Sequence, residues 1–237
     1  MKIGMFDSGV GGLNVLKEFI KVYPNNQYYY YGDTKNIPYG DKDKETLLKL
    51  SINIIKFFIE KNVDLIIIAC GTISSTCVKE LRNITTIPIL DIISPTIQYL
   101  KKNPANKILV FGTKRTIENH IFKNNLTNVI EVSTPEFVPM IENNHVDTLI
   151  IKSYLKNYLD IDILVLGCTH YPLLINEFKK YLKDNTKILD MGKILVNTIP
   201  LKNNSVSSIK LYFTKIDTVL EENIKKIIKT SYTIEQI

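Results

Sequence analysis

Cysteine is scarce in this sequence, and long hydrophobic runs are absent. The 237 residues include three cysteines, scattered and odd in number, with no C-x-x-C pair. This excludes the disulfide framework of small secreted domains, and no metal-ligand spacing joins the cysteines to His120, His145 or His170. No stretch approaches the roughly 18 uninterrupted apolar residues of a membrane span, and the N-terminal residues lack the apolar core of a signal peptide. We therefore expect a cytoplasmic protein with free thiols, no metal and no membrane partner.

The positive charge is spread along the chain rather than concentrated. The formal net charge is +6 and the isoelectric point is about 9.0. A protein that binds nucleic acid gathers lysine and arginine on one element, whereas only short clusters such as Lys101-Lys102 occur here. The pattern indicates a solvated surface and no nucleic-acid partner, with at most a weak attraction for an acidic substrate.

Apolar segments of strand length alternate with segments of helical periodicity. We expect strands over residues 2–6, 27–31, 64–69, 108–111, 163–166 and 209–214. We expect helices over residues 13–22, 44–61, 116–123, 174–182 and 219–228, and a linker over 201–208. Such alternation predicts an α/β fold with mostly parallel sheets.

One feature occurs in both halves of the sequence. An apolar strand ends in a cysteine that is soon followed by threonine, once over residues 66–72 and once over 164–170. The two cysteines, Cys70 and Cys168, are 168 − 70 = 98 residues apart, which is about the length of one small domain. The repetition predicts two similar domains with equivalent strand ends.

Strand ends are where chemistry is expected in such a fold. Ligands bind beyond the carboxyl ends of parallel strands, and a cysteine there also lies near a helix N-terminus, which favours the thiolate. A single buried cysteine usually only packs, as we expect for Cys77 in a helical stretch, but two at matching positions favour a reactive pair. His170, two residues past Cys168, is placed to tune that thiol or to assist proton transfer.

Several motifs together resemble the bacterial glutamate racemase family of the aspartate/glutamate racemase superfamily. The matching segments cover residues 6–13, 31–34, 38–40, 69–72, 138–142 and 166–172. The resemblance implies two α/β domains, related by a pseudo-twofold axis, that face each other across an active-site cleft. It places residues 1–92 and 208–237 in the first domain and 93–207 in the second.

The same resemblance implies an activity and roles for individual residues. It implies interconversion of L- and D-glutamate for peptidoglycan synthesis, without pyridoxal phosphate or a metal, so no cofactor is expected. Cys70 and Cys168 would exchange the α-proton, one starting as thiolate and the other as thiol, with Asp7 supporting Cys70 and with His170 and Glu142 supporting Cys168. The expected substrate contacts are Asp7, Ser8, Tyr39, Gly40, Gly71, Thr72, Thr169 and His170. Family members form different dimers, so the resemblance allows a homodimer without specifying its surface.

The sequence departs from the family pattern at Gly71, where the family usually has asparagine. The amide side chain that would reach the ligand is therefore missing, and a racemase acting on another amino acid, such as aspartate, stays open. Two further alternatives are a catalytically weak regulatory protein on the same fold and a hydrolase with one nucleophilic cysteine. The hydrolase alternative leaves the matching position of the second cysteine unexplained.

Overall fold

The computed structural model contains two parallel β-sheets, and residues 1–202 and 206–237 are described. The predicted linker over 201–208 thus lies partly outside the described residues. The six-stranded sheet has the order β10-β9-β2-β1-β3-β4 and the four-stranded sheet the order β6-β5-β7-β8. All strand pairs are parallel, so the expected α/β fold with mostly parallel sheets is confirmed.

The helices and strands have the following bounds. The strands are β1 (Lys2–Asp7), β2 (Gln27–Gly32), β3 (Leu65–Ile68), β4 (Ile89–Asp91), β5 (Ile108–Gly112), β6 (Val129–Ser133), β7 (Ile163–Leu166), β8 (Lys187–Asp190), β9 (Ser208–Phe213) and β10 (Thr233–Gln236). The α-helices are α1 (Leu13–Val22), α2 (Lys44–Glu60), α3 (Gly71–Thr76), α4 (Val78–Arg82), α5 (Ile93–Lys102), α6 (Lys114–Glu118), α7 (Phe137–Glu142), α8 (Thr148–Leu155), α9 (Ile175–Lys179), α10 (Met191–Thr198) and α11 (Thr218–Ile227). Short 3₁₀ helices cover Thr34–Asn36, Tyr39–Asp41 and Tyr171–Leu174.

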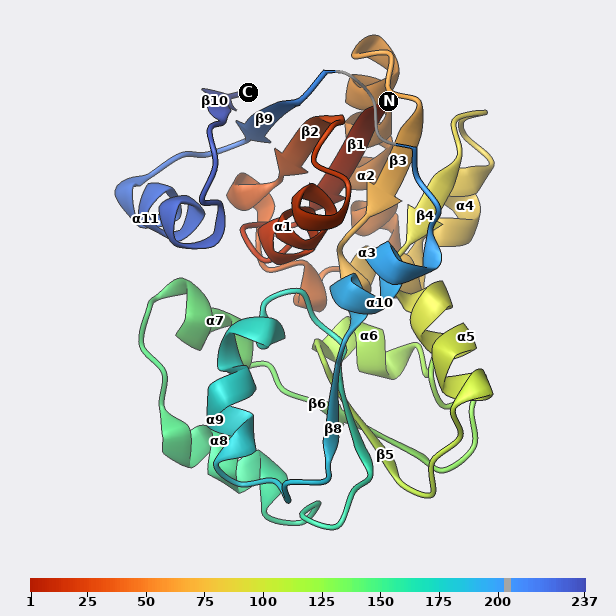
Figure 1. The fold of residues 1–237 in the computed structure, drawn as a ribbon, viewed down its shortest axis with the longest axis vertical. Coiled ribbons are helices and arrows are strands. Elements are labelled where there is room, and N and C mark those ends of the chain that lie inside the picture. Colours follow the sequence, from red (N-terminus) through yellow and green to blue (C-terminus); the bar gives the residue numbers. More distant parts are fainter. Residues whose placement is uncertain (203–205) are drawn as a thin grey trace.

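Each sheet forms the centre of one lobe. We call the six-stranded sheet with α1–α4 and α11 the first lobe, and the four-stranded sheet with α6–α9 the second lobe. Figure 1 shows the first lobe in the upper half of the molecule and the second lobe in the lower half, with α5 and α10 between them on the right. Four strands follow one another in the same spatial order in both lobes, β2-β1-β3-β4 and β6-β5-β7-β8. Cys70 and Cys168 follow the equivalent strands β3 and β7.

The two strands that precede the cysteines are entirely apolar. β3 reads Leu-Ile-Ile-Ile and β7 reads Ile-Leu-Val-Leu, and every residue of both is buried. Strands covered by helices on both faces are expected to be apolar throughout, because neither face meets water. Because these two strands are buried, Cys70 and Cys168, which follow them, are also buried inside the protein.

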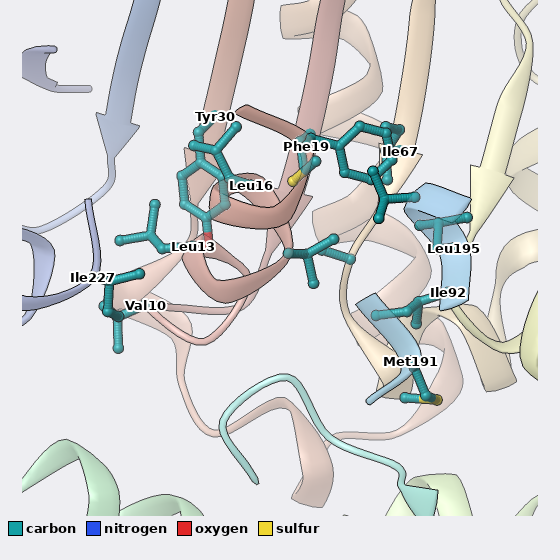
Figure 2. Close-up of a cluster of buried hydrophobic side chains, with 14 of the residues drawn as sticks. Val10, Leu13, Leu16, Phe19, Tyr30, Ile67, Ile92, Met191, Leu195 and Ile227 are labelled. Atoms are coloured by element: carbon teal, nitrogen blue, oxygen red, sulfur yellow. The ribbon is translucent and has the colours of Figure 1, made fainter. Parts of the chain in front are cut away.

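A continuous hydrophobic cluster joins the two lobes. α10 packs against both α1 and α5, and the cluster extends from Ile3 and Met5 of β1 to Val110 of β5 and Val165 of β7. Figure 2 shows part of it, including Leu13, Leu16, Phe19, Tyr30, Ile67, Ile92, Met191 and Leu195. Each fully buried side chain of this kind stabilises the fold by about 1.5–3 kcal/mol, so the lobes are held together on this side.

Several elements were not expected from the sequence. The structure adds β4, β6, β8, β10, α5, α7, α8 and α10, and two predicted helices are shorter than expected. α6 ends at Glu118 because the chain turns shortly afterwards, where His120 has a positive φ of 49°. β6 is only partly buried and β10 is fully exposed, so neither has the continuous apolar pattern of a central strand. In the described part of the chain, no helix is long and apolar enough to cross a membrane.

Candidate active site

A cavity lies between the lobes at the carboxyl ends of β1, β3, β5 and β7. The sequence-predicted site residues that line it are Ser8, Tyr39, Gly40, Cys70, Gly71, Thr72, Glu142, Cys168, Thr169 and His170. Asp7 is the exception, because it lies fully buried at the end of β1. The fold therefore brings together residues that are up to 162 positions apart in the sequence. We call this space the interlobe cavity.

Cys168 forms a hydrogen-bonded row with two partners from its own lobe. Its Sγ lies 3.6 Å from Nδ1 of His170, whose Nε2 lies 3.0 Å from Oε1 of Glu142 at the end of α7. Burial of His170 by itself lowers its pKa, but the hydrogen bonds and charges of Cys168 and Glu142 outweigh burial and hold the pKa well above its ordinary value. A protonated imidazole beside the sulfur stabilises a thiolate electrostatically.

Cys70 lies in a different environment. It is 4% exposed and directly precedes α3. Its Sγ accepts hydrogen bonds from the backbone N–H groups of Ile73 and Ser8. Burial raises the pKa of Cys70 well above its ordinary value, the negative charge of Asp7 raises it further, and the two N–H groups offset only part of this. The N–H of Ile73 in the first turn of α3 lowers the pKa of Cys70, as expected near a helix N-terminus, but burial outweighs this effect.

Asp7 connects the two lobes beneath the cavity. Its Oδ1 accepts a hydrogen bond from the backbone N–H of Gly9 at 3.0 Å, and its Oδ2 accepts one from the Thr169 hydroxyl at 3.1 Å. Burial raises the pKa of Asp7, although the nearby His170 opposes this effect. The carboxyl group of Asp7 therefore contacts the Cys168 turn through its hydrogen bond with Thr169. Its negative charge acts on Cys70 by raising the pKa of that thiol.

Two predicted contact residues are held by groups that the sequence did not single out as site residues. The hydroxyl of Tyr39 donates to Oδ2 of Asp33 at 2.6 Å, so Asp33 fixes the 3₁₀ helix that carries Tyr39 and Gly40. The hydroxyl of Thr72 lies 2.9 Å from that of Thr113 in the other lobe. Thr113 also lines the cavity. It directly follows β5, and a polar residue at the end of a strand is the sequence signal that points to it.

Other cavity-lining residues had no clear sequence signal. Lys114, Thr134 and Pro135 line the interlobe cavity, but β6, which leads to Thr134, was not expected as a strand. Cys77 is fully buried in the hydrophobic cluster of the first lobe, as expected for a packing cysteine. Across residues 1–202 and 206–237, no group of three or more His, Cys, Asp or Glu side chains is arranged to hold a metal ion.

Two thiols, one from each lobe, line one cavity. One sulfur comes from the end of β3 in the first lobe and the other from the end of β7 in the second. Ser8, Thr72 and Thr113 line the same space, and hydroxyl groups are suited to hold the polar groups of a ligand. A ligand carbon between the sulfurs could lose a proton on one face and gain one on the other.

Comparisons with known proteins agree on one family. The family model described as Asp/Glu/hydantoin racemase matches residues 30–199. The chain is 36% identical over 240 residues to a glutamate racemase of Aquifex aeolicus (strain VF5), covering 96% of this chain and 94% of the relative. It is 38% identical over 231 residues to a glutamate racemase of Campylobacter jejuni, covering 90% and 91%. A solved glutamate racemase of Francisella tularensis, in complex with D-glutamate, superposes with a TM-score of 0.88 at 29% identity, covering 100% of this chain and 97% of that one.

Proposed function

The chain belongs to the Asp/Glu/hydantoin racemase family and groups with its glutamate racemases, and on this premise we propose that Cys70 and Cys168 interconvert L- and D-glutamate by a two-base proton transfer. The observation that carries the proposal is that two buried thiols, one from each lobe, line the interlobe cavity. Racemisation requires removal of the α-proton from one face and delivery to the other, and a single base would tend to return the proton to the face it came from. Two groups on opposite faces avoid this outcome.

We infer starting roles for the two thiols from their environments. Cys70, whose pKa is raised by burial and by Asp7, starts as the thiol and protonates one face of the α-carbon. Cys168, whose sulfur lies 3.6 Å from Nδ1 of His170, is then the group that removes the α-proton from the opposite face. Each turnover leaves the pair with the roles reversed, and the return direction uses them in that order. Both sulfurs are shielded from water, which strengthens the electrostatic contacts with the reacting carbon.

Glutamate is the substrate that the comparisons favour. The relatives with the identities above are named glutamate racemases, and the Francisella structure contains D-glutamate. We place the two carboxylates and the ammonium group of the substrate against the hydroxyls and backbone N–H groups that line the cavity. The D-glutamate so formed would supply peptidoglycan synthesis, and hence cell-wall biogenesis and cell shape, in the cytoplasm.

The reaction can be tested in deuterated water. Incubation with either enantiomer of glutamate, without an added cofactor, is expected to give deuterium at the α-carbon together with loss of optical activity. Circular dichroism follows the rotation, and NMR follows the deuterium. Aspartate and alanine serve as comparison substrates. The proposed function is wrong if no α-proton exchange occurs with any of these amino acids.

The pH dependence tests the row of Cys168, His170 and Glu142. The elevated pKa of His170 means that the imidazolium is present below that pKa and is lost as the pH rises through it. Activity should therefore decline on the alkaline side when His170 loses its proton. Glu142→Gln removes a charge that raises the pKa of His170, so the alkaline decline is expected at lower pH in this variant.

The profile is measured as kcat/KM against pH for the wild-type enzyme and for the variants Glu142→Gln and Glu177→Gln. Glu177→Gln is the matched control, because Glu177 pairs with Lys180 on the surface of the same lobe. Its profile should coincide with that of the wild type. An alkaline decline that is unchanged in Glu142→Gln would show that Glu142 does not support His170.

A further inference from the structure

The backbones of the two lobes touch beside the cysteines. A Cβ atom placed on Gly71 would lie 2.6 Å from the carbonyl oxygen of Gly167, in the other lobe, and 3.7 Å from Cε of Met191. The first of these distances is too short for any real side chain. Gly71 directly follows Cys70 and Gly167 directly precedes Cys168. In this closure of the lobes, position 71 therefore accepts only glycine.

A second contact between the lobes lies on the other side of the same turn. Asn14 on α1 is 7% exposed, and its Nδ2 donates to the carbonyl oxygen of Gly11 at 3.1 Å and to that of Thr169 at 3.0 Å. Thr169 stands between Cys168 and His170. One buried amide thus ties the backbone of the Cys168 turn to the first lobe, and its loss would leave a buried carbonyl without this donor.

We propose that Gly71 and Asn14 are positioning residues that together set the distance between Cys70 and Cys168. Asn14 holds the Cys168 turn against the first lobe, and the missing side chain at Gly71 lets the two backbones close until they touch. The contact lies between lobes, so added bulk at position 71 is relieved most easily by opening the cavity. An asparagine there, as the family pattern usually has, would require a wider cleft than this chain forms.

The proposal rests on the proposed racemase function, and it predicts different effects on the rate of α-proton exchange and on the rate of inversion. Removal of the α-proton needs one cysteine within reach of the substrate, whereas inversion needs both. A wider cleft should therefore slow inversion more than it slows exchange of the α-proton with solvent. A shift of about 1 Å in a catalytic group can reduce a rate by about 100-fold.

The experiment uses the full-length chain with Gly71→Ala, Gly71→Asn and Asn14→Leu in deuterated water. For each variant, kcat is expected to fall by about 10- to 100-fold, with a smaller change in KM. The deuterium gained by the starting enantiomer, relative to that gained by the product enantiomer at early times, is expected to rise. Asn14→Leu adds no atom at position 71, so it decides the question even if the Gly71 variants fail to fold.

A matched control distinguishes displacement of the cysteines from a general loss of protein stability. In Gly4→Ala the new Cβ would lie 2.8 Å from the ring of Phe58, inside the first lobe and away from the cavity. This variant should be less stable, yet keep the wild-type ratio of exchange to inversion. The inference is overturned if the Gly71 and Asn14 variants keep wild-type kcat, or if exchange and inversion fall in parallel as in a merely destabilised enzyme. Absence of racemisation in the wild type would instead refute the proposed function.

Discussion

Replacing Cys70 or Cys168 with serine is expected to lower the rate of glutamate racemisation by roughly 10²- to 10⁴-fold, the range over which a positioned acid–base group acts. A serine hydroxyl is a much weaker acid than a thiol, so it neither removes nor returns the α-proton effectively. L- and D-glutamate have equal free energies in water, and the equilibrium constant is therefore one. The fall in kcat/KM must then be equal in the two directions, whichever cysteine is changed.

The single-serine variants should nevertheless differ from each other. Each retains one cysteine, which can still exchange the α-proton of the enantiomer whose proton faces it. In deuterated water, Cys70→Ser and Cys168→Ser are therefore expected to exchange opposite enantiomers of glutamate slowly without inverting them. NMR of the recovered enantiomers measures this selectivity.

Cys77→Ala is the control for the cysteine variants. Cys77 is buried in the core of the first lobe and does not line the interlobe cavity, so racemisation should persist in this variant. If Cys168→Ser racemised glutamate at a nearly normal rate in both directions, the two-base assignment would fail. Loss of activity in only one of the two serine variants would favour an enzyme with a single essential cysteine.

Phe111→Ala is expected to lower the free energy of unfolding by about 3–5 kcal/mol, as truncation of a buried phenylalanine generally does. Phe111 is fully buried on β5 and its ring packs against those of Phe137, Tyr154 and Phe178. Its removal leaves a cavity at the centre of the second lobe. The carbonyl of Phe111 also accepts the N–H of Gly167 at 2.7 Å, so the disturbance lies next to the Cys168 turn.

Denaturant unfolding of Phe111→Ala and Leu149→Ala measures this effect. Leu149 belongs to the same lobe but is 71% exposed, and its truncation should change the stability by no more than about 0.5 kcal/mol. Equal losses in the two variants would contradict the position of Phe111 in the core.

Much of the first lobe follows from local sequence patterns. The predicted helix over 13–22 coincides with α1, and the one over 44–61 differs from α2 by one residue. Both have strongly amphipathic sequences, in which the apolar residues repeat with helical spacing. In α2 the start is also set by Asp43, whose side chain accepts the N–H of Thr46 at 2.8 Å. Elements with weak patterns, such as β6 and α10, form because the surrounding tertiary structure offers them a surface to pack on.

The sequence by itself determined the strand-end positions of the two cysteines, because an uninterrupted apolar strand followed by a polar turn can be read locally. Only the tertiary structure decided how these turns meet. Three features of the site depend on residues that are distant in the chain or lie in different lobes. They are the buried environment of Cys70, the row from Cys168 to Glu142, and the contact of Gly71 with Gly167. The distances depend on how separate segments pack, and the pKa shifts depend on desolvation and on neighbouring charges, all of which arise only in the folded chain.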